Sequence, residues 1–230
     1  MLKLNYPLHQ ISFLHRSSKR FKSFFDKSGR SWENAWKENN TPWETGSPSA
    51  GLIHAFENPV IKSTLVHCKR ALIPGCGSGY DVKYLHSLNV FDNITGIDIS
   101  EAAIKLVKTT LQQIADDHSD VEVLTANYFQ WNPSNKFDLI FDYLFFAALD
   151  IPARSDWGDA TRRLMIPRGI LITKLFPLFN ENVDTVEKLE VGPPYLVRLE
   201  DYRKILEPRG FNLLQTAEVN IYVILWYYPV

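Results

Sequence analysis

A glycine-rich stretch, Pro74 to Gly79, is the feature of this 230-residue chain whose spacing most directly suggests chemistry. It follows Arg70–Ile73, a short apolar segment that we expect to be a strand. Glycines let the backbone turn sharply and approach a ligand closely, because no side chain intervenes. The spacing here is G-x-G-x-G, whereas the dinucleotide fingerprint places its third glycine three residues after the second. The pattern therefore predicts a ligand-binding turn poorly suited to a pyrophosphate, with a purely structural tight turn as the alternative.

Asp98 stands at the end of the next expected strand, Asn93–Asp98. In α/β folds an acidic residue at this place accepts hydrogen bonds from ribose hydroxyls. NAD and S-adenosylmethionine both carry that ribose, so Asp98 favours an adenosine cofactor without choosing between the two. The alternative is that Asp98 only places negative charge at the N-terminus of the following helix, for which Ser100 is a good N-cap.

Asn127 and Tyr128 follow a third expected strand, Val121–Thr125. In this architecture that position lies beside the adenine ring. We therefore expect Asn127 to bond the edge of the ring and Tyr128 to pack on its face. The alternative is a loop asparagine next to a buried tyrosine.

Three tryptophans that lie close together in the sequence form a further group: Trp32, Trp36 and Trp43. Residues four apart share one face of a helix, so Trp32 and Trp36 point the same way. Aromatic faces attract cations by roughly 0.5–2 kcal/mol each, and the sulfur of S-adenosylmethionine is a sulfonium cation. An aromatic wall of the three rings that also covers the cofactor is favoured only together with the family resemblance given below. The alternative is that they are ordinary core aromatics.

Strands and helices alternate along the chain, which predicts a mostly parallel sheet with helices on both faces. In such a sheet the ligand lies outside the carboxyl ends of the strands, where the residues above are placed. An irregular insert is expected from Pro177 to Tyr195. The expected helices are 31–38, 50–56, 81–88, the segment after Ser100, 153–165 and 201–206. The seven expected strands are 70–73, 93–98, 121–125, 137–141, 170–175 and two near residues 213 and 223.

Five longer segments point to a family more specifically than the single residues above. They are Trp32-Glu-Asn-Ala-Trp36 with Thr41-Pro-Trp43-Glu, Leu72-Ile-Pro-Gly-Cys-Gly77, Phe137-Asp-Leu-Ile-Phe-Asp-Tyr143-Leu-Phe-Phe146 and Gly192-Pro-Pro-Tyr195. Together they resemble the thiopurine S-methyltransferase family, and most closely its plant and fungal branch of thiol and halide methyltransferases. Pro74 is informative, because most methyltransferases of this class have an acid there and this family has proline. The resemblance covers roughly residues 31 to 225.

The resemblance implies a Rossmann-like class I methyltransferase domain that binds S-adenosyl-L-methionine. Asn127 and Tyr128 fall at the adenine position, although the branch often has an acidic residue there. Tyr143 matches the tyrosine after the fourth strand, next to the methyl donor. The positions that match cofactor-binding residues are Trp32, Trp36, Trp43, Gly75, Gly77, Asp98, Asn127, Tyr128 and Tyr143.

We expect direct in-line methyl transfer to a small thiol, bisulfide, halide or thiocyanate ion. The sequence has no evident Ser-His-Asp order and no metal-ligand cluster, and an acceptor that arrives ionised needs little acid–base help. Alignment and desolvation can then contribute roughly 7–11 kcal/mol. Tyr143 and Asp142 are the expected catalytic residues. Asp142 would orient the acceptor or assist its deprotonation, with a structural role as the alternative, so the use of a general base stays open.

Other functions remain open on the residues alone. An NAD-linked oxidoreductase is disfavoured by the glycine spacing. A methyltransferase acting on a carboxylate or an amine would share the same cofactor site. A catalytically inactive adenosine-binding protein is a third alternative, against which the tryptophans and Tyr143 argue.

The composition and net charge of the chain argue against several classes of binding partner. A net charge of −1 argues against a general nucleic-acid binder. No apolar run approaches the roughly 18 residues of a membrane span, so we expect no membrane partner. Cys68 and Cys76 suit a reducing compartment, and no metal site is expected. We expect a monomer acting on a small molecule, although no residue pattern fixes the oligomeric state.

The first 25 residues form a separate segment. They contain no Asp or Glu, and their basic residues are interleaved with Ser, Phe and Leu. A basic, acid-free, amphipathic start resembles a mitochondrial presequence, and an ordinary flexible leader is the alternative. We therefore expect a leader at 1–25 and a methyltransferase domain at 26–230. The expected location is cytoplasmic, with mitochondrial targeting as the alternative.

Overall fold

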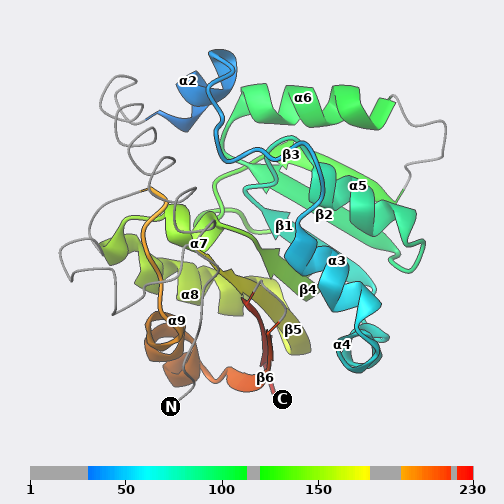
Figure 1. Cartoon of the computed structure of the whole chain (residues 1–230), viewed down its shortest axis with the longest axis vertical. Coiled ribbons are helices and arrows are strands. Elements are labelled where there is room, and N and C mark those ends of the chain that lie inside the picture. The colour runs from blue at the N-terminus through cyan, green and yellow to red at the C-terminus, as the bar shows by residue number, and fades with distance from the viewer. Residues whose placement is uncertain (1–30, 113–119, 177–192, 219–221, 230) are drawn as a thin grey trace.

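The structure of the chain is a computed structural model. It describes residues 31–112, 120–176, 193–218 and 222–229 (Figure 1). The expected leader at 1–25 lies outside the described residues, as does the expected insert up to residue 192.

One sheet of seven strands forms the centre of the molecule, in the order β3-β2-β1-β4-β5-β7-β6. The pairs β1–β2, β2–β3, β1–β4 and β4–β5 are parallel, and β7 runs antiparallel to both of its neighbours. The strands are β1 (Arg70–Pro74), β2 (Asn93–Asp98), β3 (Val121–Thr125), β4 (Phe137–Asp142), β5 (Met165–Leu175), β6 (Asn212–Glu218) and β7 (Tyr222–Tyr227). The mostly parallel, seven-stranded sheet predicted from the sequence is confirmed.

The strand order reverses between β1 and β4. From β1 the chain proceeds outward to β2 and β3, and it then returns to the other side of β1 as β4. In parallel sheets, ligands bind where the order reverses, outside the carboxyl ends of the strands. The glycine-rich turn, which begins at the end of β1, lies at this switch point.

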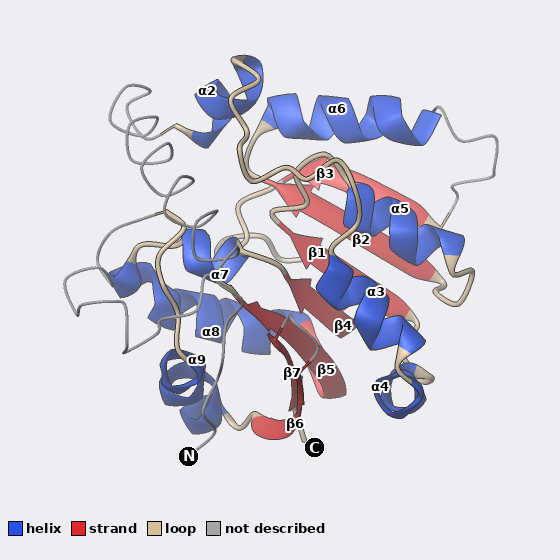
Figure 2. Cartoon of the chain, in the orientation of Figure 1, coloured by secondary structure: helices blue, strands red, loops and turns tan. Residues whose placement is uncertain are grey.

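Helices cover both faces of the sheet (Figure 2). One core contains buried side chains of α3 to α6, and the other contains those of α7, α8 and α9. Neighbouring strand residues alternate between the two cores, as the two-residue period of a strand requires: Leu139 and Phe141 belong to the first, Ile140 to the second. The helices are α2 (Trp32–Lys37), α3 (Ala50–Glu57), α4 (Pro59–Leu65), α5 (Tyr80–Ser87), α6 (Glu101–Gln112), α7 (Phe145–Ala148), α8 (Arg154–Leu164) and α9 (Leu199–Leu206), with short 3-10 turns at Ile151–Ala153 and Glu207–Arg209.

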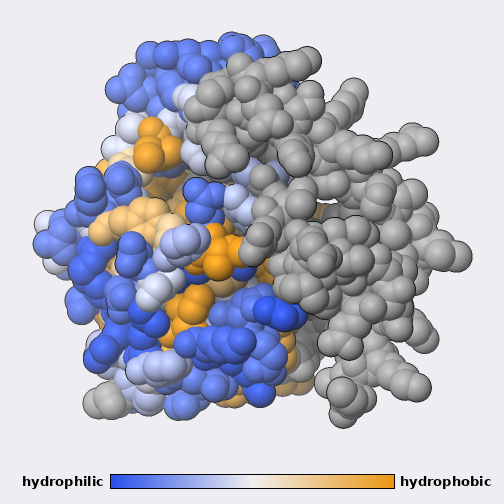
Figure 3. All heavy atoms as spheres, turned by 90° about the vertical axis from the view of Figure 1, so that its left-hand side faces the viewer, coloured by the Kyte–Doolittle hydropathy of each residue, from blue (hydrophilic) through white to orange (hydrophobic). Residues whose placement is uncertain are grey.

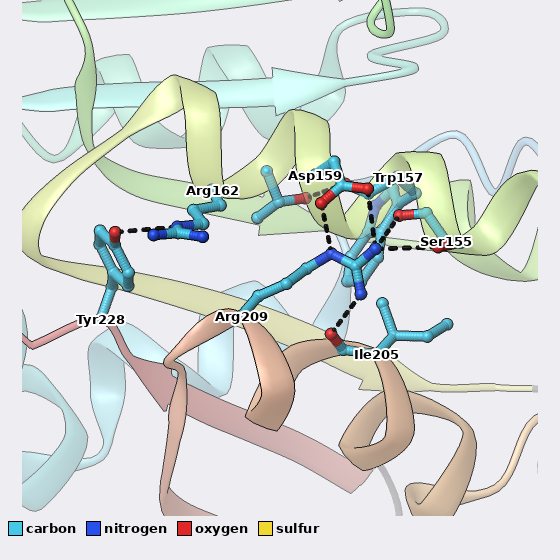
Figure 4. A network of polar contacts seen from close by, with 8 residues as sticks. Ser155, Trp157, Asp159, Arg162, Ile205, Arg209 and Tyr228 are labelled. Carbon is cyan, nitrogen blue, oxygen red and sulfur yellow. Dashed lines mark hydrogen bonds and ion pairs between the residues drawn. The ribbon is translucent and has the colours of Figure 1, made fainter.

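The contact between α8 and the end of α9 depends on Gly158 and on Arg209, whose contacts are drawn in Figure 4. A Cβ atom on Gly158 would lie 2.4 Å from Cγ2 of Ile205, so the helices approach this closely only because the side chain is absent. Arg209 donates to the Asp159 carboxylate at 2.8 Å, and also to the Ser155 hydroxyl and the Ile205 carbonyl. These contacts fix α8 against the end of α9 on the face of the sheet that α7, α8 and α9 cover.

Most of the predicted elements are present, with two kinds of difference. Helix α4 was not predicted, although its signals are plain: Asn58 caps it through hydrogen bonds from the backbone N–H groups of Val60 and Ile61, and Pro59 is its first residue. Strand β5 begins at Met165 instead of Ile170, because a register shift opposite Phe137 accommodates the proline and glycine that suggested a break.

The described surface is polar over much of its area. In the space-filling view of Figure 3, hydrophilic residues cover much of the described face and apolar atoms show between them. Among the described helices, none has both the length and the apolar character needed to cross a membrane.

Candidate active site

A cavity of about 1120 Å³, including open solvent at its mouth, lies at the carboxyl ends of β1, β2 and β4. Seven of the ten predicted site residues line it: Trp32, Trp36, Trp43, Gly75, Gly77, Asp98 and Tyr143. Segments far apart in the sequence meet here, as the strand-end argument requires.

The glycine turn and Asp98 form one hydrogen-bonded unit at the floor of this cavity. The Asp98 carboxylate accepts from the backbone N–H of Gly77 at 3.1 Å and from that of Ser100 at 2.9 Å. Burial raises the pKa of Asp98, and the two N–H groups oppose that rise. Gly75 has φ +61°, and a Cβ there would lie 2.8 Å from the Phe145 ring, so the turn needs glycine for its conformation and its space.

The three tryptophans form an aromatic wall over the cavity. Trp43 contacts both of the others edge to face, with ring centroids 5.3 Å from Trp32 and 6.0 Å from Trp36. All three line the cavity. The shared helix face predicted for Trp32 and Trp36 is therefore the face that looks onto the cavity.

Glu33 fixes this wall to the start of α6. Its carboxylate accepts from the Ser100 hydroxyl at 2.6 Å and from the Ala102 backbone N–H at 3.2 Å. The hydrogen bond from Ser100 is the main reason that the pKa of Glu33 falls to about 2. A carboxylate at a helix N-terminus is stabilised by the free N–H groups there, so α2 is held against the start of α6.

Glu44 lies over the glycine turn, and the sequence reading missed it. The Ser78 hydroxyl donates to Glu44, and a Cβ on Gly77 would lie 2.6 Å from Glu44 Oε1. Burial, together with nearby Asp81 and Asp98, raises the pKa of Glu44 to about 7. Its only sequence signal was its place next to Trp43.

Asp81, in the first turn of α5, is a second carboxylate that the sequence reading missed. It lines the cavity and accepts from the backbone N–H of Ser49 at 2.6 Å. Burial raises its pKa to about 6, opposed by that hydrogen bond and by the positive charge of Lys174. With Glu44 and Asp98, it gives the cavity around the glycine turn three carboxylates.

Tyr143 stands at the other side of the glycine turn, at the end of β4. The Lys174 ammonium, on β5, lies 4.3 Å from the centre of the Tyr143 ring. Burial raises the pKa of Tyr143 to about 12, and the carboxylates of Asp81 and Glu44 add to that rise. The hydroxyl therefore stays protonated at neutral pH.

Asp142 does not line the cavity. Its side chain is buried on the other face of the sheet, where it accepts from the Trp157 indole at 2.9 Å and from the Phe146 backbone N–H at 3.1 Å. Burial raises its pKa to about 7. This position favours the structural alternative for Asp142.

Asn127 and Tyr128 are also outside the lining of the cavity. The Asn127 side chain accepts from the backbone N–H of Phe129 at 3.0 Å, and the Tyr128 hydroxyl is 2.8 Å from that of Thr161. The buried Tyr128 ring packs against Phe145, which does line the cavity. Their predicted contact with adenine stays a prediction.

Comparison with known proteins identifies the family of the chain that forms this cavity. The sequence profile of thiopurine S-methyltransferase (TPMT) matches residues 27–225. The chain belongs to the thiopurine S-methyltransferase family. This confirms the resemblance seen in the sequence segments, which covered roughly residues 31 to 225.

Two plant relatives of this family member are a probable thiol methyltransferase 2 and a thiocyanate methyltransferase 1, both from Arabidopsis thaliana. The first is 33% identical over 86% of this chain and 80% of its own length. The second is 33% identical over 92% of this chain and 82% of its own length.

Solved structures confirm the Rossmann-like methyltransferase fold. The magnesium protoporphyrin IX methyltransferase of Synechocystis, with bound S-adenosylhomocysteine, superposes with a TM-score of 0.61 at 19% identity, covering 76% of this chain and 81% of that one. A methyltransferase from Methanosarcina mazei gives the same TM-score and covers 75% of this chain and 98% of that one.

This member of the thiopurine S-methyltransferase family is therefore an enzyme, and S-adenosylmethionine is its methyl donor. The residues of the cavity fit that donor. Carboxylates suit its ammonium and sulfonium charges, tryptophan faces attract cations, and the glycine turn admits a ligand close to the backbone.

Proposed function

We propose that this enzyme methylates a small thiol, bisulfide or another small anion such as thiocyanate or a halide. One observation carries the proposal: the lining of the cavity has carboxylates around the glycine turn, and Lys174, outside the lining, places its ammonium against the ring of the lining residue Tyr143. The two Arabidopsis relatives, named as a probable thiol methyltransferase and a thiocyanate methyltransferase, support the same class of acceptor.

In this proposal Asp98 accepts the hydroxyls of the donor's ribose, as its strand-end position suggests. Trp32, Trp36 and Trp43 cover the donor and exclude water. Glu44, placed between the tryptophans and the glycine turn, faces the positive charge of the donor. Because Glu44 is partly buried, water screens this attraction less than it would at the surface.

The acceptor would enter beside Tyr143. The bound donor supplies a methyl group on positively charged sulfur, whose carbon–sulfur bond breaks as the acceptor's lone pair bonds to carbon, the electron pair staying on the donor sulfur. The chain's own part is to align the two reactants and keep the site dry, which can contribute roughly 7–11 kcal/mol. Tyr143 keeps its proton and so orients the acceptor without serving as a base.

Asp142 is, in our proposal, a positioning residue. By accepting the first N–H groups of α7 and the Trp157 indole, it fixes the helix that carries Phe145. Asn127 and Tyr128 would shape the adenine end in a similar way, Tyr128 through its contact with Phe145.

We infer a cytoplasmic monomer that acts on small molecules and not on nucleic acid. Net charge near zero supports the last point. A fluorescent protein fused after residue 30 tests the location, and its accumulation in mitochondria would favour the targeting alternative. Light scattering of the purified chain tests the oligomeric state.

The activity is tested with the full chain and S-adenosylmethionine. Hydrosulfide, thiocyanate, iodide and a small organic thiol are offered separately, and methylated product is measured in the headspace or by mass spectrometry. We expect turnover with at least one sulfur acceptor. Firm binding of the donor without methylation of any of them would contradict the proposal, and activity on a carboxylate or an amine would replace it.

A further inference from the structure

Lys174, on β5, is a mostly buried cation that lies outside the lining of the cavity. Its ammonium lies between two aromatic rings, 4.3 Å from the centre of Tyr143 and 5.1 Å from that of Phe176. Within the described part of the chain it makes no hydrogen bond, and no carboxylate lies within 4.0 Å of it. A cation in such surroundings loses hydration without gaining a full partner, which is costly unless an anion binds nearby.

Asp81 is the carboxylate that influences this lysine, but it is engaged elsewhere. Its carboxylate accepts the backbone N–H of Ser49 at 2.6 Å. The charge of Asp81 raises the pKa of Lys174, yet burial prevails and the pKa falls to about 8. The ammonium is therefore only partly compensated.

The order of the strands places Lys174 next to Tyr143, where we propose that the acceptor binds. Strands β2, β1, β4 and β5 are neighbours, so Asp98, the glycine turn, Tyr143 and Lys174 follow one another along the carboxyl edge of the sheet. A donor whose ribose is held by Asp98 extends past the glycine turn, and its reactive sulfur then lies toward Tyr143. Lys174 comes one strand further along the same edge.

Resting on the proposed function, we propose that Lys174 determines acceptor specificity: its positive charge, acting from beside the Tyr143 ring and just outside the lining, selects a small anion at this end of the cavity. A thiolate, bisulfide, thiocyanate or iodide ion would gain the charge attraction and lose little hydration among the aromatic rings. A neutral acceptor would gain nothing from the lysine.

The test compares Lys174→Met, which removes the charge, with Lys174→Arg, which keeps it. Lys62→Met, on the exposed face of α4, is the matched control for losing a lysine. Each protein is assayed with hydrosulfide, thiocyanate and iodide. Thiocyanate is also titrated calorimetrically into protein saturated with S-adenosylhomocysteine, so that anion binding is measured without turnover.

We expect Lys174→Met to lower kcat/KM for all three anions and to weaken thiocyanate binding, each by roughly 10- to 100-fold, the range typical of a hydrogen bond to a charged group. Donor affinity and melting temperature should match those of the control, and Lys174→Arg should retain most of the binding. Unchanged thiocyanate binding in Lys174→Met would overturn the proposal.

Two other outcomes would also overturn it. A loss for hydrosulfide with full activity on iodide, which has no proton to lose, would make Lys174 a base. A fall in donor affinity or in melting temperature would make it a structural residue. If the unmodified enzyme methylates none of the anions, the proposed function fails, but the calorimetric titration still decides whether Lys174 holds an anion.

Discussion

The lining of the cavity and the residue that packs against its Tyr143 differ in charge. Around the glycine turn, the lining includes Glu44, Asp81 and Asp98. Lys174 is not a lining residue, but its ammonium lies against the Tyr143 ring, where the charge of Asp81 also reaches it. In our proposal a positively charged donor lies against the carboxylates, and a negatively charged acceptor lies at Tyr143, near the charge of Lys174. Methyl transfer removes the sulfonium charge of the donor and the negative charge of the acceptor, so the charge attraction that depends on these two groups is lost when the reaction is complete.

The largest expected effect comes from breaking the donor end at Asp98. Asp98→Ala removes the ribose contact and also the hydrogen bonds to Gly77 and Ser100, so donor affinity should fall by at least about 100-fold, since hydrogen bonds to charged groups contribute about 1.5–3 kcal/mol each. Isothermal titration with S-adenosylhomocysteine measures it.

Asp138→Ala is the matched control for that change. Asp138 also accepts two backbone N–H groups, those of Lys69 and Arg70, but at the opposite end of β1. It should lose comparable stability and keep donor affinity. If both variants lose affinity equally, Asp98 acts only through the fold.

The next effect is the pH dependence of turnover, which tests the charge of Lys174. Iodide does not titrate, so its methylation reports on the enzyme alone. Lysine is charged below its pKa, and the pKa of Lys174 is about 8; iodide turnover should therefore hold near neutral pH and fall as pH rises through about 8. Asp81, Glu44 and Tyr143 face the same region, and their pKa values of about 6, 7 and 12 leave their charge nearly constant around pH 8 to 9.

Lys174→Arg provides the control, because arginine keeps its charge throughout this range. Its iodide turnover should stay level up to pH 9. A decline of the same size in Lys174→Arg would assign the pH dependence to another group.

A smaller effect of opposite sign is expected at the donor end. The pKa of Glu44, raised to about 7 by burial, means that its negative charge is present above pH 7 and lost as pH falls through that value. Donor affinity should therefore rise several-fold between pH 6 and pH 8, since one pKa unit corresponds to 1.36 kcal/mol. Glu44→Gln should flatten most of this rise in a fluorescence titration, leaving the part due to Asp81. An equally steep rise in Glu44→Gln would contradict a role for this carboxylate.

The smallest effect is expected from a segment of the cavity lining that begins at Pro193. Pro193 and Pro194 line the cavity, and Tyr195 anchors them through its backbone N–H to Ala147 and its hydroxyl to Asp150. Tyr195→Phe removes about 1 kcal/mol of hydrogen bonding, which should raise the KM for the acceptor about fivefold and leave donor affinity unchanged. Steady-state kinetics with hydrosulfide would show this, and a change confined to donor affinity would count against it.

The sequence by itself determined the fold class and much of the donor end. Strand and helix periods are local, and parallel strands bring their carboxyl ends to one edge, so the glycine turn, Asp98 and Tyr143 could be placed together in advance. The spacing of Trp32 and Trp36 on one helix face was equally local.

Only the tertiary structure decided which neighbours face the cavity. Asp142 and Tyr143 are adjacent, but successive side chains along a strand point to opposite faces, and packing against α7 and α8 turned Asp142 away. Tyr128 was drawn into the core by Thr161 in the same way. Glu44, Asp81 and Lys174 carry no shared sequence pattern; they meet because a loop, a helix start and a strand end converge on one edge of the sheet, a relation that depends on long-range packing.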